Sequence, residues 1–185
     1  MNQPVAVLDA DVLVPVLVCD LLLSLFDAEL FQPAVSPTIL EEVERSLIAD
    51  FPRLDTDGLR RRVDAMARAL ALHVHGVTQE NDVALAGINR KDRHVAALAL
   101  TQHADLVVTN DRRLRREIDA LGLPLRALSA DEFVLRLVLD NRTQVDDVID
   151  ELVIKRQRRP VTRAALLDQL AVAVPRAIAE LRSTD

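Results

Sequence analysis

The fold is decided by the stretch VAVLDAD, which spans residues 5–11. Apolar residues from Val5 to Leu8 lead directly into Asp9, and Asp11 follows two positions later. A short apolar run of this kind is typical of a buried strand in a parallel sheet. Open α/β sheets usually bind their ligand at the carboxyl ends of such strands. Asp9 is therefore a candidate functional acid, because a buried carboxylate is costly unless a cation or hydrogen-bond donors compensate.

The composition predicts an ordinary globular protein without internal disulfides. The chain has 185 residues, half of them apolar, and a single cysteine, Cys19. It shows no signal-peptide pattern, and its most apolar stretch, residues 12–26, is too short for a membrane span. We therefore expect a cytoplasmic protein without membrane contact. The net charge of −6 repels polyanions, so nucleic-acid binding would need local basic patches.

Strand and helix patterns alternate along the first two thirds of the chain. Periodicity predicts further buried strands over 106–109 and 125–128, and helices over 15–28, 38–49, 57–72 and 92–103. Thr38 and Glu41 have the spacing of a capping box for the second of these helices. Strands separated by helices favour right-handed βαβ units and a parallel sheet. We therefore expect an α/β fold, an α/β/α sandwich with a short, mostly parallel sheet.

The last third of the chain has only helical periodicity. Ser129 and Glu132 have capping-box spacing for a helix that runs to about Asp140, and Pro160 and Pro175 divide the remainder into further helices. We therefore divide the chain into an α/β domain at 1–128 and a helical C-terminal extension at 129–185, packed on or beside it.

Four acidic residues lie where a parallel sheet could bring them to one edge. Asp9 and Asp111 follow strands, and Glu42 and Asp92 lie near helix starts. Taken singly, Asp92 and Asp111 are most simply helix caps and Glu42 a surface acid. Taken together, the four would suit one or two Mg²⁺ or Mn²⁺ ions, which prefer carboxylate oxygens. His94 is predicted to lie on a helix surface.

Four segments, in this order, resemble the motifs of the PIN domain, the fold of metal-dependent ribonucleases. They are VLDADVL (7–13), SPTILEEV (36–43), KDRHVAALA (91–99) and ADLVVTND (104–111), and the resemblance covers about residues 5–128. The resemblance implies that the catalytic and metal-binding residues are Asp9, Glu42, Asp92 and Asp111. Thr109 and Asn110 would shape the site. Asp11 departs from the pattern, because many relatives have Asn there, and we treat it as an accessory residue.

The implied activity is that of a Mg²⁺- or Mn²⁺-dependent endoribonuclease, which makes the 1–128 domain the catalytic one. Small bacterial PIN proteins are commonly VapC-type toxins held inactive by a cognate antitoxin, so the expected partners are RNA, an antitoxin and a second copy of the chain. The basic residues beside the predicted acids are candidate contacts to the RNA backbone. They are Lys91, Arg93, Arg112, Arg113 and Arg115.

Two alternatives stay open at this point. Asp9 and Asp11 after a strand also resemble the start of haloacid-dehalogenase-type phosphatases, with Asp9 as nucleophile and Asp11 as acid. That chemistry ordinarily needs a lysine near the site, and Lys91 is the candidate. The other alternative is a non-catalytic PIN-fold module that binds a partner through its helical tail.

Overall fold

A four-stranded, all-parallel sheet lies at the centre of the computed structural model, which describes residues 3–77, 83–156 and 160–183. The strands are β1 (Val5–Leu8), β2 (Gln32–Ala34), β3 (Leu106–Val108) and β4 (Arg126–Leu128), in the order β2-β1-β3-β4. The two central strands, β1 and β3, are almost entirely buried. These strands confirm the prediction of a short parallel sheet with a buried first strand.

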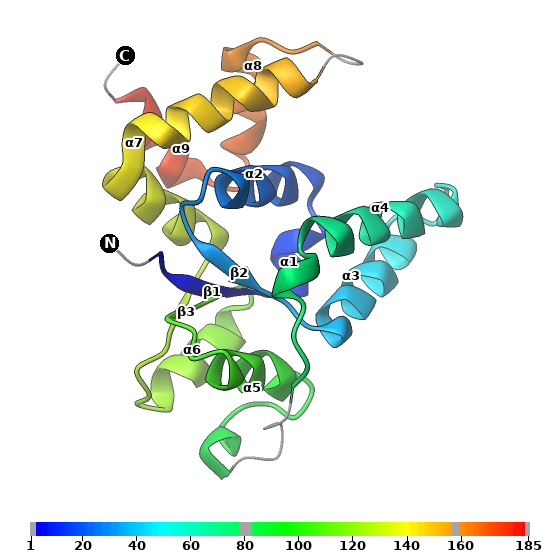
Figure 1. Ribbon diagram of the computed structural model, residues 1–185, viewed down its shortest axis with the longest axis vertical. Helices are drawn as coiled ribbons and strands as arrows, with labels where there is room; N and C mark the ends of the chain where they lie inside the picture. Colours follow the sequence, from blue (N-terminus) through cyan, green and yellow to red (C-terminus); the bar gives the residue numbers. More distant parts are fainter. Residues whose placement is uncertain (1–2, 78–82, 157–159, 184–185) are drawn as a thin grey trace.

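Helices cover both faces of this sheet (Figure 1). Helices α2 (Val16–Asp27) and α7 (Ala130–Lys155) lie on one face, and α5 (Arg93–Thr101) and α6 (Arg112–Ala120) lie on the other. The short α1 (Ala10–Leu13) directly follows β1. Beyond the strand ends, α3 (Pro37–Asp50) and α4 (Thr56–Ala69) form a projecting hairpin. The predicted α/β/α arrangement is therefore confirmed.

Single-turn 3-10 helices lie in the described parts of the connection between α4 and α5. They are η1 (Ala71–His73) and η2 (Val83–Leu85). Beside η1, Val35 forms an isolated parallel bridge with Val74. This bridge holds the end of β2 against the chain that leaves the α3–α4 hairpin.

Two local predictions were wrong, each for a local reason. Strand β2 was not predicted because it is short and contains Pro33, which a sheet tolerates only at an edge such as this one. The predicted capping box of Thr38 and Glu41 is not formed. Instead, Ser36 is the N-cap of α3 and its Oγ accepts from the Ile39 N–H at 3.2 Å, with Pro37 as the first helical residue.

The C-terminal third is helical, as predicted. The Ser129–Glu132 capping box is formed: Ser129 Oγ accepts from the Glu132 N–H at 3.2 Å, and Glu132 Oε2 accepts from the Ser129 N–H at 2.9 Å. Helix α7 kinks at Asn141, next to the predicted helix end at Asp140. Helices α8 (Arg163–Leu170) and α9 (Pro175–Arg182) pack against α7.

The core between the sheet and helices is apolar and continuous. Its largest buried side chains include Phe31 beside β2 and Phe133 of α7, whose rings meet edge to face with centroids 5.0 Å apart. The C-terminal extension therefore contributes to the same core as the sheet. A domain boundary between residues 128 and 129 stays a prediction. Within the described ranges, no helix has the length and apolar character that crossing a bilayer requires.

Candidate active site

Asp9 occupies the carboxyl end of β1, where the chain turns into α1. Its side chain is 8% exposed and caps α1, because Oδ1 accepts from the Ala10 N–H at 2.7 Å. Oδ2 accepts from Thr109 Oγ1 at 2.7 Å. Burial raises the pKa of Asp9, and the charge of Glu42 adds to this effect, while the Thr109 hydrogen bond opposes it.

Thr109 connects three acidic residues at the end of β3. Besides Asp9, its Oγ1 lies 3.3 Å from Asp11 Oδ2 and accepts from the Asp111 N–H at 3.1 Å. The side chain is fully buried, so no water competes for these bonds. A hydroxyl carries one proton and donates to one carboxylate at a time. The shorter distance assigns that proton to Asp9.

Asp11 follows Asp9 into the same space, on the first turn of α1. Its Oδ2 accepts from the Asn110 N–H at 2.9 Å, whereas its buried Oδ1 has no hydrogen-bond partner in the part of the chain that the structure describes. Burial and, next, the charge of Asp9 raise the pKa of Asp11 to about 7. Asn110 also accepts from the Ala130 N–H through its side-chain oxygen at 3.2 Å, which ties the loop after β3 to α7.

Asp111 and Asp92 begin neighbouring helices but differ in what their side chains do. Asp111 caps α6, because its Oδ1 accepts from the Arg113 and Leu114 N–H groups at 2.7 and 3.1 Å. The side chain of Asp92 makes no cap bond to α5, and its buried Oδ2 has no hydrogen-bond partner within the described ranges. Both residues occupy the predicted N-cap positions, but only the Asp111 side chain forms cap bonds.

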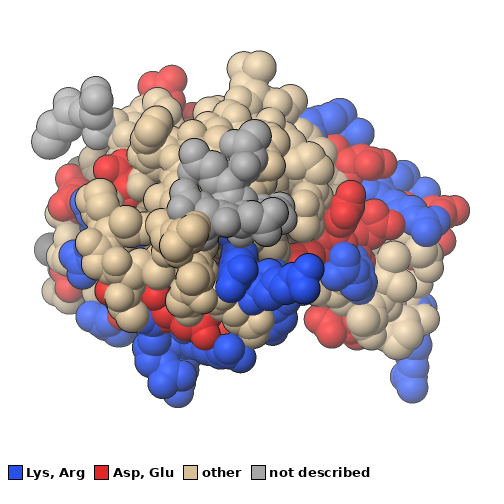
Figure 2. Space-filling model, turned by 90° about the horizontal axis from the view of Figure 1, so that it is seen from below, with Lys and Arg blue, Asp and Glu red and all other residues tan. Residues whose placement is uncertain are grey.

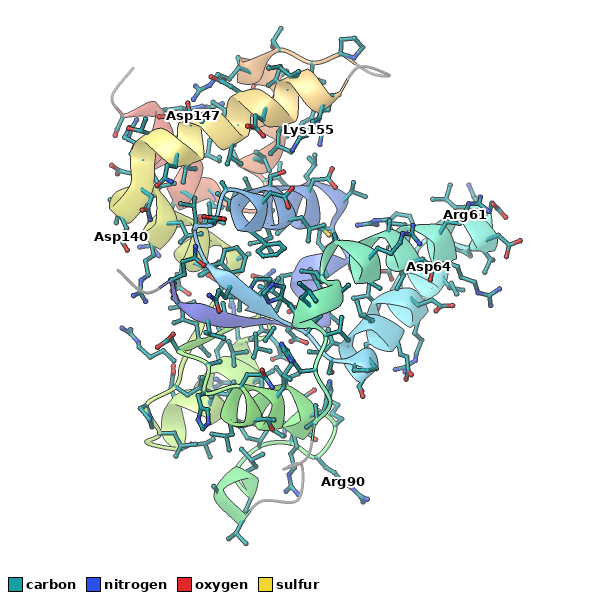
Figure 3. All side chains as sticks on the ribbon, viewed as in Figure 1. Arg61, Asp64, Arg90, Asp140, Asp147 and Lys155 are labelled. Atoms are coloured by element: carbon teal, nitrogen blue, oxygen red, sulfur yellow. The ribbon has the colours of Figure 1, made fainter. Side chains whose placement is uncertain are left out.

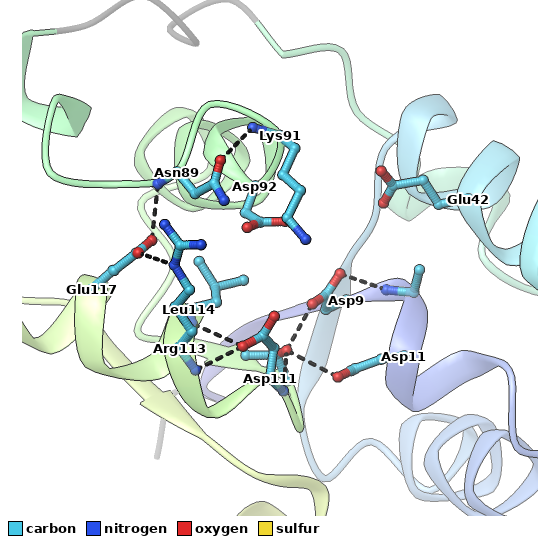
Figure 4. Close-up of polar contacts among 12 residues, drawn as sticks. Asp9, Asp11, Glu42, Asn89, Lys91, Asp92, Asp111, Arg113, Leu114 and Glu117 are labelled. Carbon is cyan, nitrogen blue, oxygen red and sulfur yellow. Dashed lines mark hydrogen bonds and ion pairs between the residues drawn. The ribbon is translucent and has the colours of Figure 1, made fainter.

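The surroundings of Asp92 are acidic. Burial raises its pKa, and the charges of Asp111 and Asp9 act in the same direction, while the ammonium of Lys91, 3.9 Å away, opposes them. Figure 4 shows the carboxylates of Asp9, Asp11, Asp92 and Asp111 around one space. The fold therefore collects like charges from β1, α1, α5 and α6 at one edge of the sheet.

Glu42 of α3 lies further from this group, across the same space (Figure 4). Its Oε2 lies 3.2 Å from His94 Nε2, and the His94 side chain is only 8% exposed. The prediction that His94 lies on a helix surface is therefore wrong. A signal was present in the sequence, because His94 lies one turn before Leu98, on the apolar side of α5.

The carboxylates fit a hard divalent cation in chemistry. Oxygen ligands suit Mg²⁺ and Mn²⁺. One buried carboxylate oxygen of Asp11 and one of Asp92 could serve as ligands, because neither has a hydrogen-bond partner among the residues that the structure describes. As they stand, no three His, Cys, Asp or Glu groups of the described residues are close enough to hold a metal ion. A cation there would have to draw the side chains together.

Some of the basic residues near the site form hydrogen bonds within the protein, and others are exposed. Arg93 donates to the Ile88 and Ala86 carbonyl oxygens at 3.0 and 3.4 Å, and so holds the loop before α5. Arg113 Nε donates to Glu117 Oε1 at 2.6 Å, and Arg115 donates to Glu132 at 2.8 Å. The side chain of Lys91 is 71% exposed, and Arg112 is also exposed.

Glu117 also shapes the site, although the sequence did not lead us to predict it. Its second oxygen accepts from the Asn89 N–H at 2.9 Å, so Glu117 joins the loop before Asp92 to α6 (Figure 4). Its spacing of four residues from Arg113 on a helix is the local signal for half of this arrangement. The bond to Asn89 has no local signal, because it depends on how α6 packs against that loop.

Comparison with known proteins agrees with the geometry. No curated protein and no solved structure matches the chain. The PIN-domain family model matches residues 5–113. This range contains Thr109 and the acidic residues of the site, which are Asp9, Asp11, Glu42, Asp92 and Asp111. Because this match covers more than half of the sequence, the chain belongs to the PIN-domain family, a family with a nuclease fold.

Proposed function

We propose that this protein is a metal-dependent endoribonuclease that hydrolyses RNA phosphodiester bonds. PIN domains are usually nucleases that act on RNA with divalent metal ions. The proposal rests on two buried carboxylate oxygens, one on Asp11 and one on Asp92, that lie inside a cluster of like charges and have no hydrogen-bond partner among the described residues. A cation would compensate that repulsion, since carboxylates are costly to bury without one. The family match also favours this reading over the phosphatase alternative.

In this proposal Asp9 and Asp111 are the central metal ligands, and Asp92 and Glu42 bind directly or through water. Hydrogen bonds from Thr109 Oγ1 and the Ala10 N–H fix the two oxygens of the Asp9 carboxylate, and an ionised carboxylate oxygen keeps a further lone pair for a cation. A bound cation would orient a water, lower its pKa and stabilise the charge on the leaving oxygen. The proposed cofactor is one or two Mg²⁺ or Mn²⁺ ions.

The path of the RNA would follow α6. A groove of about 520 Å³ there is lined by Arg112, Arg115, Arg116 and Asp119. The three arginines lie at helical spacings of three and four residues, so they share one face of α6. Figure 2 shows basic and acidic side chains interleaved on the face of the molecule seen from below. We therefore propose that phosphate contacts come from this local arginine face and from Lys91 and Arg113 beside the acids.

The decisive experiment is RNA cleavage by the purified chain with Mg²⁺, Mn²⁺ or EDTA. Asp9→Asn keeps an oxygen that can accept from the Ala10 N–H, so the variant should fold while cleavage is lost. Asp64→Asn is the matched control, since Asp64 is an exposed acid on the projecting α4 (Figure 3). Full, EDTA-insensitive cleavage by Asp9→Asn would refute the proposal.

We also propose, from the resemblance to VapC-type proteins, that the nuclease is the toxin of a toxin–antitoxin pair. The supporting arrangement is the α3–α4 hairpin, which carries Glu42 and projects from the rest of the fold as a surface for a partner (Figure 1). Co-expression with the product of the neighbouring gene should suppress both cleavage and growth inhibition. Equal cleavage with and without that product would exclude the toxin role.

A further inference from the structure

We propose that His94 is a positioning residue that holds the Glu42 carboxylate toward the metal site. The proposal rests on the proposed nuclease function and assigns a role to a residue outside the acidic set. His94 and Glu42 are 52 positions apart, and their side chains meet at 3.2 Å. The contact joins α5, which packs on β1 and β3, to α3 of the projecting hairpin.

His94 is more buried than Glu42, so we infer that His94 orients Glu42 and not the reverse. The side chain of His94 is 8% exposed, whereas that of Glu42 is 28% exposed. A glutamate at a half-exposed helix position has several rotamers open to it. The imidazole is fixed by the core, so it selects among the rotamers of Glu42 rather than the reverse.

The atoms engaged also matter. His94 Nε2 contacts Oε2 of Glu42, and no other hydrogen bond holds that carboxylate among the residues that the structure describes. Donation from Nε2 leaves the other carboxylate oxygen, Oε1, for a ligand. The charge of Glu42 raises the pKa of Asp9, which places the Glu42–His94 pair beside the acidic cluster.

His94 contacts the proposed metal ligand Glu42 and does not itself bind the metal in this proposal. Partners that hydrogen-bond to metal-binding side chains fix their orientation, and their removal typically lowers metal affinity or activity about 10- to 100-fold. Without the imidazole, Glu42 would turn toward solvent from the projecting hairpin. We therefore expect His94 to act on metal affinity through Glu42 alone.

The test is a double-mutant cycle with Mn²⁺ as the probe. Full-length protein, stripped of metal, is titrated with Mn²⁺ and the bound ion is followed by electron paramagnetic resonance. His94→Ala should weaken Mn²⁺ binding about 10- to 100-fold. The same change in a Glu42→Ala background should have no further effect on the dissociation constant.

Two further variants separate positioning from a loss of stability. Leu98→Ala, one turn along the buried face of α5, also removes a core side chain and should leave the Mn²⁺ dissociation constant unchanged. His94→Gln retains a side-chain N–H and should recover part of the affinity, and it serves if His94→Ala does not fold.

The outcomes distinguish this inference from the proposed function. If wild-type protein cleaves RNA and binds Mn²⁺ but His94→Ala and His94→Gln bind it equally well, only the positioning role is overturned. Equal losses from His94→Ala in the presence and absence of Glu42 also overturn it. If wild-type protein neither cleaves RNA nor binds Mn²⁺, the nuclease proposal and the positioning role both fall.

Discussion

Asp11→Asn should stabilise the metal-free protein at alkaline pH. The pKa of Asp11 is raised from 3.8 to about 7, first by burial and then by the charge of Asp9. A raised pKa means that the folded state binds the proton more tightly than the unfolded state. The stabilising contribution of the proton is complete below pH 3.8, the unfolded value, and is lost as the pH rises through about 7.

The size of the effect follows from the same values. The interval from 3.8 to about 7 corresponds to about 4 kcal/mol, at about 1.4 kcal/mol per pKa unit. Asp11 is half-buried, so solvent screening reduces this cost. Asparagine keeps the acceptor for the Asn110 N–H but places an amide where Oδ1 now lacks a partner. We therefore expect a net gain of about 2 kcal/mol at about pH 8 and none near pH 4.

Urea denaturation in EDTA, followed by circular dichroism at both pH values, measures this difference. Asp64→Asn is again the control, because Asp64 lies exposed on α4 and its substitution should change stability by less than about 0.5 kcal/mol at either pH (Figure 3). The reasoning is refuted if Asp11→Asn is no more stable than wild type at about pH 8. An equal gain at both pH values would also show that charge is not the cause.

Three further predictions concern Thr109, Arg112 and Gly122. Thr109→Val removes the hydroxyl bound to Asp9 and should cost about 1–3 kcal/mol of unfolding free energy in urea, whereas Thr109→Ser should retain most of it. Arg112→Gln should reduce the slope of log affinity against log salt for RNA by about one, as measured by fluorescence anisotropy, and an unchanged slope would remove Arg112 from the phosphate path. Gly122→Ala should cost about 1 kcal/mol of unfolding free energy in urea, because Gly122 has φ 66. Gly76→Ala is the control and should be neutral or slightly stabilising in urea, because a Cβ there would meet nothing within 4 Å and Gly76 has no positive φ.

Much of the fold was readable because local patterns set the backbone. The apolar run from Val5 to Leu8 predicts its strand, and Ser129 with Glu132 predicts the start of α7 to the residue. Both patterns act within a few residues, through burial of one face and through capping bonds. Strand β2 lacked such a pattern, since Pro33 argues against a strand except at a sheet edge.

The sequence by itself determined which acids end strands or begin helices, and so which ones a parallel sheet could gather at one edge. Only the tertiary structure decided their partners. Thr109 contacts Asp9 across 100 positions and His94 contacts Glu42 across 52. Among the described residues, nothing donates a hydrogen bond to the buried oxygen of Asp92. The physical reason is that a strand end or helix start is encoded over a few residues, whereas side-chain contacts and burial depend on how distant elements pack.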